Sequence, residues 1–190
     1  MARIAFILAD TFEDSEYRVP FDSLRAEGHE PIVVGTEAGK MVSGKKGKER
    51  VETELAASAV TADDFEALLI PGGYSPDRLR TDADMVRLVR EFDAARKPLA
   101  AICHGGWMLA EAGIVEGRTV TSWPSIKTDL VNAGARWVDR ELVEDRNLIT
   151  SRKPEDLPAF CSALLVQLDR CSKAAEKPRR TRADPRACAR

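Results

Sequence analysis

Short segments that are apolar throughout constrain the fold of this chain most. Three of them lie at residues 3–9, 67–70 and 98–102, and each ends close to a glycine-rich or polar turn. Uninterrupted apolar runs of this length are typical of strands buried on both faces, as in a parallel sheet that helices cover.

The segments between these runs have the pattern of helices. Residues 13–27 form a helix-like stretch closed by Gly28, and residues 31–34 then read as a second buried strand. Residues 82–96 place apolar side chains on one helical face, and a further helix is expected at residues 107–111. Because strand–helix–strand order favours parallel pairing, the sequence predicts an α/β fold: an open, mainly parallel sheet with helices on both faces.

The chain is expected to contain one domain and a tail. Residues 157–168 carry the apolar stripe of a last helix, so we expect the domain to span residues 1–170. Residues 171–190 are rich in lysine and arginine and lack large apolar side chains, a composition that predicts a disordered tail. The basic segment 40–50 is expected to be a solvated loop or hairpin, and we assign neither basic segment a function.

Charge, hydropathy and cysteine spacing argue against several classes of protein. A formal net charge of -2 over 190 residues gives no excess of positive charge for binding nucleic acid. No apolar run approaches the roughly 20 residues that span a bilayer, so we expect a cytoplasmic protein that binds no membrane. The four cysteines do not have the spacing of metal ligands. We therefore expect no disulfide, no bound metal and no cofactor.

We expect the chemistry of this chain at Cys103. This residue follows the apolar run 98–102 directly and precedes His104, Gly105 and Gly106. A nucleophile between a parallel strand and a helix is held on a tight, strained turn at the edge of the sheet where α/β folds bind ligands. The helix N-terminus would favour the thiolate and lower its pKa. The alternative is that Cys103 is a small buried apolar residue.

The other cysteines have weaker surroundings for reactivity. Cys161 falls on the apolar stripe of the last helix and is expected to be inert, whereas Cys171 and Cys188 are expected to be exposed thiols without activating neighbours. Trp107, four residues after Cys103 on the same expected helix, is the aromatic residue best placed to be a neighbour of the site.

Four short motifs, taken together, resemble the PfpI-type intracellular protease family. They lie at residues 12–14, 69–73, 101–105 and 122–127 and read FED, LIPGG, AICHG and SWPSIK. That family lies within the superfamily of the Parkinsonism-associated deglycase protein and shares the flavodoxin-like fold of class I glutamine amidotransferases. The resemblance covers about residues 3–169 and leaves out only the tail.

The resemblance implies a role for each matching residue. Cys103 would be the nucleophile, His104 its base or orienting group, and the backbone N–H groups of Gly73 and His104 an oxyanion hole. Glu13 would be the buried acid that is hydrogen-bonded to the cysteine. Without the resemblance, its position predicts only an ordinary acid in the first turn of a helix. Asp77 stands where the family has a glutamate that completes the triad across a subunit interface, which implies a homodimer or an assembly of dimers.

The resemblance favours a stress-protective protein that acts through this cysteine. One hypothesis is an enzyme that removes reactive carbonyl adducts, of the deglycase or glyoxalase kind; the alternative enzyme is an intracellular cysteine peptidase, which the shorter side chain of Asp77 disfavours. The substrate would be a small carbonyl compound or a peptide. Another hypothesis is oxidation of Cys103 by reactive oxygen species, and a non-catalytic one is a holdase-like chaperone with an exposed apolar patch.

Overall fold

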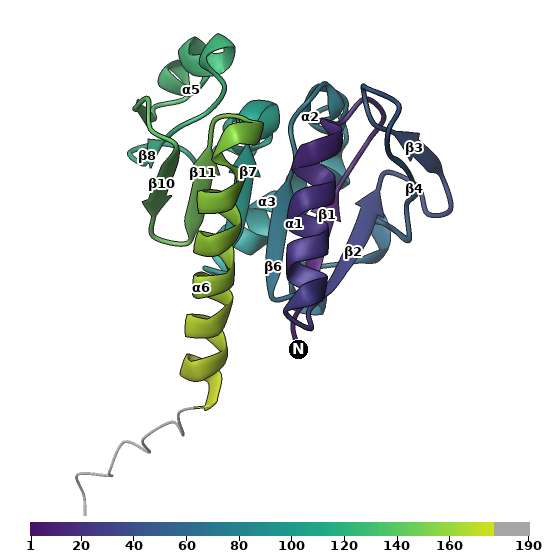
Figure 1. Cartoon of the computed structure of the whole chain (residues 1–190). Helices are drawn as coiled ribbons and strands as arrows, with labels where there is room; N and C mark the ends of the chain where they lie inside the picture. Colours follow the sequence, from purple (N-terminus) through teal and green to yellow (C-terminus); the bar gives the residue numbers. More distant parts are fainter. Residues whose placement is uncertain (177–190) are drawn as a thin grey trace, which may run out of the picture.

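A seven-stranded sheet lies between two layers of helices in the computed structural model of this chain, which describes residues 1–176 (Figure 1). The strands of the sheet are β1 (Arg3–Ile7), β2 (Glu30–Gly35), β5 (Leu55–Ala56), β6 (Ala67–Ile70), β7 (Leu99–Ile102), β10 (Leu142–Asp145) and β11 (Leu148–Ser151). Their order is β10-β11-β7-β6-β1-β2-β5, and only β10 pairs antiparallel with its neighbour. The predicted mainly parallel sheet is confirmed.

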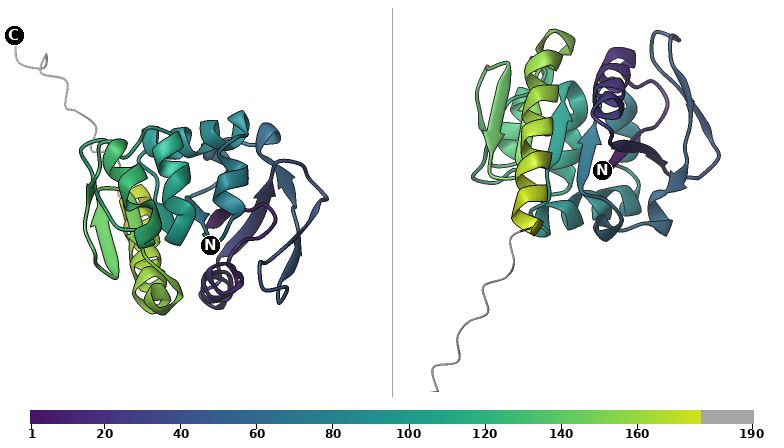
Figure 2. Two further views of the ribbon diagram at one scale, coloured as in Figure 1. Left: turned by 90° about the horizontal axis from the view of Figure 1, so that it is seen from above. Right: turned by 60° about the horizontal axis from the view of Figure 1, so that its bottom comes forward.

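Helices cover both faces of this sheet, as expected (Figure 2). They are α1 (Asp14–Ala26), α2 (Ser75–Leu79), α3 (Ala83–Ala94), α4 (Gly106–Glu111), α5 (Lys127–Asn132) and α6 (Leu157–Glu176). Because successive strand residues point to opposite faces, β1 supplies both cores. Ile4 and Phe6 belong to the core shared with α1 and α6, whereas Ala5 and Ile7 belong to the core shared with α3 and α4.

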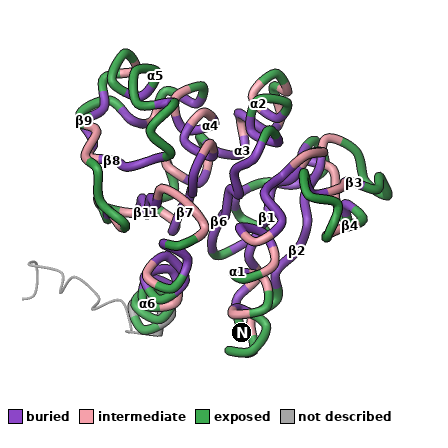
Figure 3. Tube along the Cα trace, turned by 45° about the horizontal axis from the view of Figure 1, so that its top comes forward, coloured by how far each residue is buried: buried purple, intermediate pink, exposed green. Residues whose placement is uncertain are grey.

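The central strands are buried along nearly their whole length, which is why they read as continuous apolar runs (Figure 3). The remaining short strands lie outside this sheet: β3 (Met41–Ser43) pairs with β4 (Arg50–Glu52), and β8 (Thr119–Val120) pairs with β9 (Arg136–Trp137). Within residues 1–176, none of the helices combines the length and apolar character that crossing a membrane requires.

The last helix is longer than the sequence predicts. Helix α6 continues to Glu176, so the boundary expected at residue 170 lies inside it. Lysine, alanine and glutamate, which are good helix formers, occupy residues 173–176 and favour this continuation. The rest of the expected tail, residues 177–190, lies outside the described residues.

The basic segment 40–50 forms a hairpin, one of the two forms expected, and its turn is fixed onto the start of α1. The buried side chain of Asp14, in the first turn of that helix, is the anchor. Its carboxylate accepts hydrogen bonds of 2.8–2.9 Å from the backbone N–H groups of Lys46, Lys48 and Glu49. The β3–β4 turn therefore lies beside the N-terminus of α1, close to the carboxyl edge of the sheet.

Candidate active site

Cys103 occupies a strained turn where β7 ends. It begins a single 3₁₀ turn, Cys103–Gly105, that leads directly into α4. Its φ of 61° lies in the left-handed region, which costs a residue with a Cβ atom about 1–2 kcal/mol. The predicted strained turn is therefore confirmed, and the cysteine is only 8% exposed.

Two glycines make room for this turn. A Cβ atom at Gly72 would lie 2.7 Å from Cys103 Cβ and 2.9 Å from the His104 nitrogen. A Cβ atom at Gly105 would lie 2.6 Å from the Ile70 carbonyl oxygen. Backbone contacts this close exclude any side chain. The ends of β6 and β7 can meet at the cysteine only because both positions are glycine.

The carboxyl group against the Cys103 sulfur belongs to Glu16, which the sequence did not single out. Glu16 is fully buried on the first turn of α1, and its Oε2 accepts a hydrogen bond of 2.8 Å from the Gly72 N–H. Glu16 Oε2 and Cys103 Cβ each lie 2.7 Å from the position that a Cβ atom at Gly72 would take, so the carboxyl and the thiol are neighbours and affect each other's pKa. Nothing in the sequence distinguishes Glu16 from other acids of a first helical turn, so contact with the sulfur is what identifies it.

The expected role of Glu13 is thereby corrected. Glu13 is the N-cap residue of α1, and its two oxygens lie 2.6 Å from the ammonium nitrogens of Lys45 and Lys46. Burial opposes its ionisation, but the two lysines outweigh burial and lower the pKa of Glu13. Because the helix starts one residue after Glu13, Glu16 is the acid that turns inward beneath Gly72, and Glu13 is an ionised partner of the hairpin.

Glu16 and Cys103 oppose each other's ionisation. Burial, with the nearby Glu13 carboxylate, raises the pKa of Glu16 to about 8, so this carboxyl is largely protonated at neutral pH. Burial, and then the Glu16 carboxylate, raise the pKa of the Cys103 thiol, which is opposite to the lowering expected from a helix N-terminus. Since the two groups are coupled, the pair holds at most one negative charge near neutral pH.

Two backbone N–H groups counter this rise by favouring negative charge on the sulfur. The N–H groups of Gly73 and His104 both donate to Cys103 and lower its pKa. Gly73 has a φ of 77°, and a Cβ atom there would lie 2.5 Å from the Glu13 nitrogen. These are the two donors predicted for an oxyanion hole; in this structure both act on the sulfur, and their role toward an oxyanion stays a prediction.

The His104 ring lies between the sulfur and a serine. Its Nδ1 is 3.2 Å from Cys103 Sγ, and its Nε2 is 3.2 Å from Ser125 Oγ. Adjacent side chains in a regular element point apart, so the left-handed turn is what brings these two together. Burial, with the positive charge of Lys45, lowers the pKa of His104, which keeps the ring neutral at neutral pH. Trp107 packs against this ring with 5.0 Å between centroids, as expected for a neighbour of the site.

Asp77 lies away from this cluster within the described chain. It is exposed on α2, and its N–H donates to the Tyr74 carbonyl at 3.2 Å. Among the interactions of residues 1–176, its carboxylate makes no hydrogen bond or ion pair with Cys103 or His104. Completion of a triad by Asp77 from another subunit stays a prediction.

Lys45 is a second residue that the sequence did not reveal. It lies in the turn of the β3–β4 hairpin, and Glu13 raises its pKa through their ion pair, so it stays protonated. Its positive charge acts on Cys103, on Glu16 and on His104. The sequence shows several lysines in this turn but not which of them lies near the cysteine. That depends on the hydrogen bonds by which Asp14 fixes the turn.

The cluster can support addition of a nucleophile to a carbonyl carbon. Cys103 supplies the sulfur, Glu16 a proton, and the Gly73 and His104 N–H groups a place for negative charge. Within residues 1–176, no group of three or more histidine, cysteine and acidic side chains is arranged to hold a metal ion.

Residues 2–167 match the model of the DJ-1/PfpI family. Protein/nucleic acid deglycase 2 of Escherichia coli is 46% identical over 83% of this chain and 92% of its own length. General stress protein 18 of Bacillus subtilis is 44% identical over 88% of this chain and 98% of its own length. Among solved structures, Drosophila melanogaster DJ-1beta has a TM-score of 0.80 and 28% identity, covering 91% of this chain and 96% of that one.

Replacing Glu16 by glutamine is expected to change how stability depends on pH. Since the folded pKa of Glu16 is raised to about 8, its contribution to stability is fully present below its unfolded pKa and is lost as pH rises through the folded value. Between pH ~5.5 and ~8, the free energy of unfolding of the wild type should fall by about 2–3 kcal/mol relative to Glu16→Gln. Urea denaturation of both proteins at several pH values measures this, and parallel pH profiles would contradict it.

Proposed function

The chain belongs to the DJ-1/PfpI family, and from this premise we propose that it is a stress-protective, cysteine-dependent enzyme that removes reactive carbonyl adducts from amines. Relatives named as a deglycase and as a general stress protein support this proposal. The observation that carries it is the Cys103 sulfur, held by its turn among the Glu16 carboxyl, the His104 ring and two backbone N–H groups.

The pairing of the Cys103 thiol with the buried Glu16 carboxyl suits this chemistry. In the form that reacts, the thiol proton has passed to the neutral His104 ring, whose Nδ1 lies 3.2 Å from the sulfur, while Glu16 keeps its own proton, so the sulfur is a thiolate and the carboxyl is an acid at the same time. The thiolate adds to the carbonyl carbon as the C=O electrons move to oxygen, and the N–H groups of Gly73 and His104 stabilise that oxyanion. The Glu16 proton then passes to the oxygen or to the leaving amine, so one buried pair supplies both nucleophile and acid.

Peptide hydrolysis receives less support from the site. A peptidase triad usually has a carboxylate or an amide that orients the histidine, and the second ring nitrogen of His104 lies beside the hydroxyl of Ser125 instead. Asp77, the residue expected to supply that carboxylate, is exposed and does not contact His104 within the chain. Addition to a carbonyl adduct requires no such residue.

Turnover of a methylglyoxal adduct tests the proposed activity. With methylglyoxal-treated N-acetylarginine as substrate, Cys103→Ser should abolish product formation and Glu16→Gln should lower kcat/KM by about 100-fold, because it removes the acid. The matched control is Glu27→Gln, the same change at the exposed end of the same helix, which should leave the rate unchanged. A parallel assay with free methylglyoxal separates adduct removal from consumption of released aldehyde. If Cys103→Ser stays active, or if Asp77→Ala costs as much as Glu16→Gln, the proposal is wrong.

Peroxide oxidation of Cys103 is a second candidate role, favoured by the donors around the sulfur. The N–H groups that stabilise a thiolate, together with the Glu16 carboxyl, also suit the oxygens of a sulfinate. Limiting peroxide should therefore convert Cys103 to the sulfinic acid while Cys161, whose pKa burial raises to about 11, stays reduced. Peptide mass spectrometry measures this; oxidation of exposed Cys171 ahead of Cys103 would exclude the role.

We also propose that the protein is a homodimer or an assembly of dimers, in which the exposed Asp77 lies at the subunit interface. Sedimentation velocity at micromolar concentration should show a dimer or a larger species, and Asp77→Arg should shift the distribution toward monomer by introducing the opposite charge. A wild-type protein that sediments only as a monomer would contradict this assembly.

A further inference from the structure

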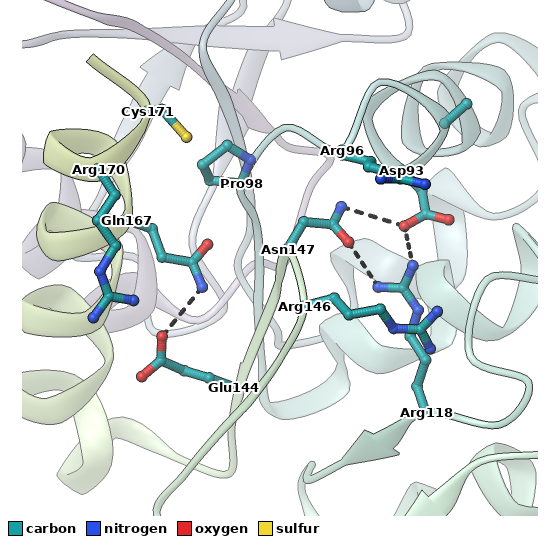
Figure 4. Close-up of a pocket in the computed structure, with 11 residues that line it drawn as sticks. Asp93, Arg96, Pro98, Arg118, Glu144, Arg146, Asn147, Gln167, Arg170 and Cys171 are labelled. Carbon is teal, nitrogen blue, oxygen red and sulfur yellow. Dashed lines mark hydrogen bonds and ion pairs between the residues drawn. The ribbon is translucent and has the colours of Figure 1, made fainter. Parts of the chain in front are cut away.

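A cavity of about 930 Å³ opens at the edge of the sheet opposite Cys103 (Figure 4). Pro98, which lines it, precedes β7, whereas Cys103 follows β7, so the length of a strand separates the two places. The end of α3, the turn between β10 and β11, and the C-terminal half of α6 form its walls. The cavity is therefore no part of the candidate active site.

A buried arginine holds one wall of this cavity in place. Arg118 is only 6% exposed, and Figure 4 shows its guanidinium bridging Asp93 and Asn147. The Arg118–Asn147 hydrogen bond is 2.9 Å long, and Asn147 also donates to the Lys97 carbonyl at 3.1 Å. These hydrogen bonds join the end of α3, the residue Arg118 and the turn between β10 and β11. The wall is therefore rigid before any ligand binds.

Positive charge exceeds negative charge around the cavity. Four arginines line it, against the two acids Asp93 and Glu144. Asp93 is already engaged by Arg118, and Glu144 accepts a hydrogen bond from the Gln167 amide. On a chain whose net charge is -2, this is a local reversal of sign.

Three of the arginines are exposed and are available to a ligand. They are Arg96, Arg146 and Arg170. Within residues 1–176, the side chains of Arg96 and Arg170 make no hydrogen bond or ion pair, and the side chain of Arg146 pairs only with Asp145, at 3.0 Å. Arg96 and Arg146 also adopt φ values of 55° and 59°, although glycine or asparagine would do so more easily. Each of these two turns therefore has an arginine at a position where the backbone conformation favours a different residue.

We propose that this cavity binds small organic anions with two or more negative charges, such as polycarboxylates or phosphate esters. A guanidinium offers a planar fork of donors that matches carboxylate and phosphate oxygens, and two arginines without a side-chain partner in the described chain line this one cavity. Glu144, on the α6 side of the cavity, can accept a hydrogen bond from a hydroxyl group of the same ligand. The lysine- and arginine-rich segment that follows α6 has the same sign as the cavity and is a poor occupant.

Calorimetric titration of the full-length protein with citrate and with pyrophosphate tests this proposal. The titrations are run at one fixed ionic strength, because exposed arginines attract any anion weakly at low salt. At least one probe should bind saturably with one site per chain, and Arg96→Gln/Arg170→Gln should weaken it about tenfold. The matched control Arg25→Gln/Arg50→Gln removes the same charge from exposed arginines elsewhere and should change affinity less than about twofold.

The identity of the tighter probe distinguishes carboxylate from phosphate recognition. Glu144→Gln should tighten either one, since it removes a negative charge from the wall. Cys103→Ser should leave binding unchanged, so this result is independent of the proposed enzyme activity. Amide NMR shifts should move at Arg96, Arg146 and Arg170, and not around Cys103. Absence of saturable binding, or equal weakening by the control pair, would overturn the proposal.

Discussion

The left-handed backbone at Cys103 is the constraint on which the rest of the site depends. It turns the chain out of β7 so sharply that the sulfur meets the adjacent His104 ring at 3.2 Å. The strain of about 1–2 kcal/mol is small beside the burial of two apolar cores, which hold the strand ends in register. Gly72 and Gly105 stand where any Cβ atom would force the turn apart.

The turn also determines the electrostatics of the site, because it buries the sulfur against a carboxyl group. Two acids this close in a dry site cannot both ionise, so the pKa values of Glu16 and Cys103 are both raised. Lys45 favours ionisation of both groups, and the N–H groups of Gly73 and His104 favour negative charge on the sulfur. The mainly parallel sheet supplies this geometry by ending neighbouring strands at one edge.

Much of this could be predicted from the sequence, since apolar runs and glycines act locally. The strands, the position of Cys103 and its strained turn follow from neighbouring residues. The choice between Glu13 and Glu16 could not be predicted, because it depends on which acid of a helical turn faces a loop far along the chain. The same holds for Lys45, which Asp14 places, and for α6, whose favourable helix formers extend it past the expected boundary.

The central claim is that Glu16 is protonated at neutral pH because it is buried beside Cys103. Carbon-13 NMR of the glutamate side-chain carboxyls, followed through a pH titration, measures that proton directly. One resonance should titrate near pH 8, and Glu16→Gln should remove it while Glu13→Gln does not. If every glutamate titrates near its ordinary pKa, Glu16 is ionised at neutral pH and the account of the site is wrong.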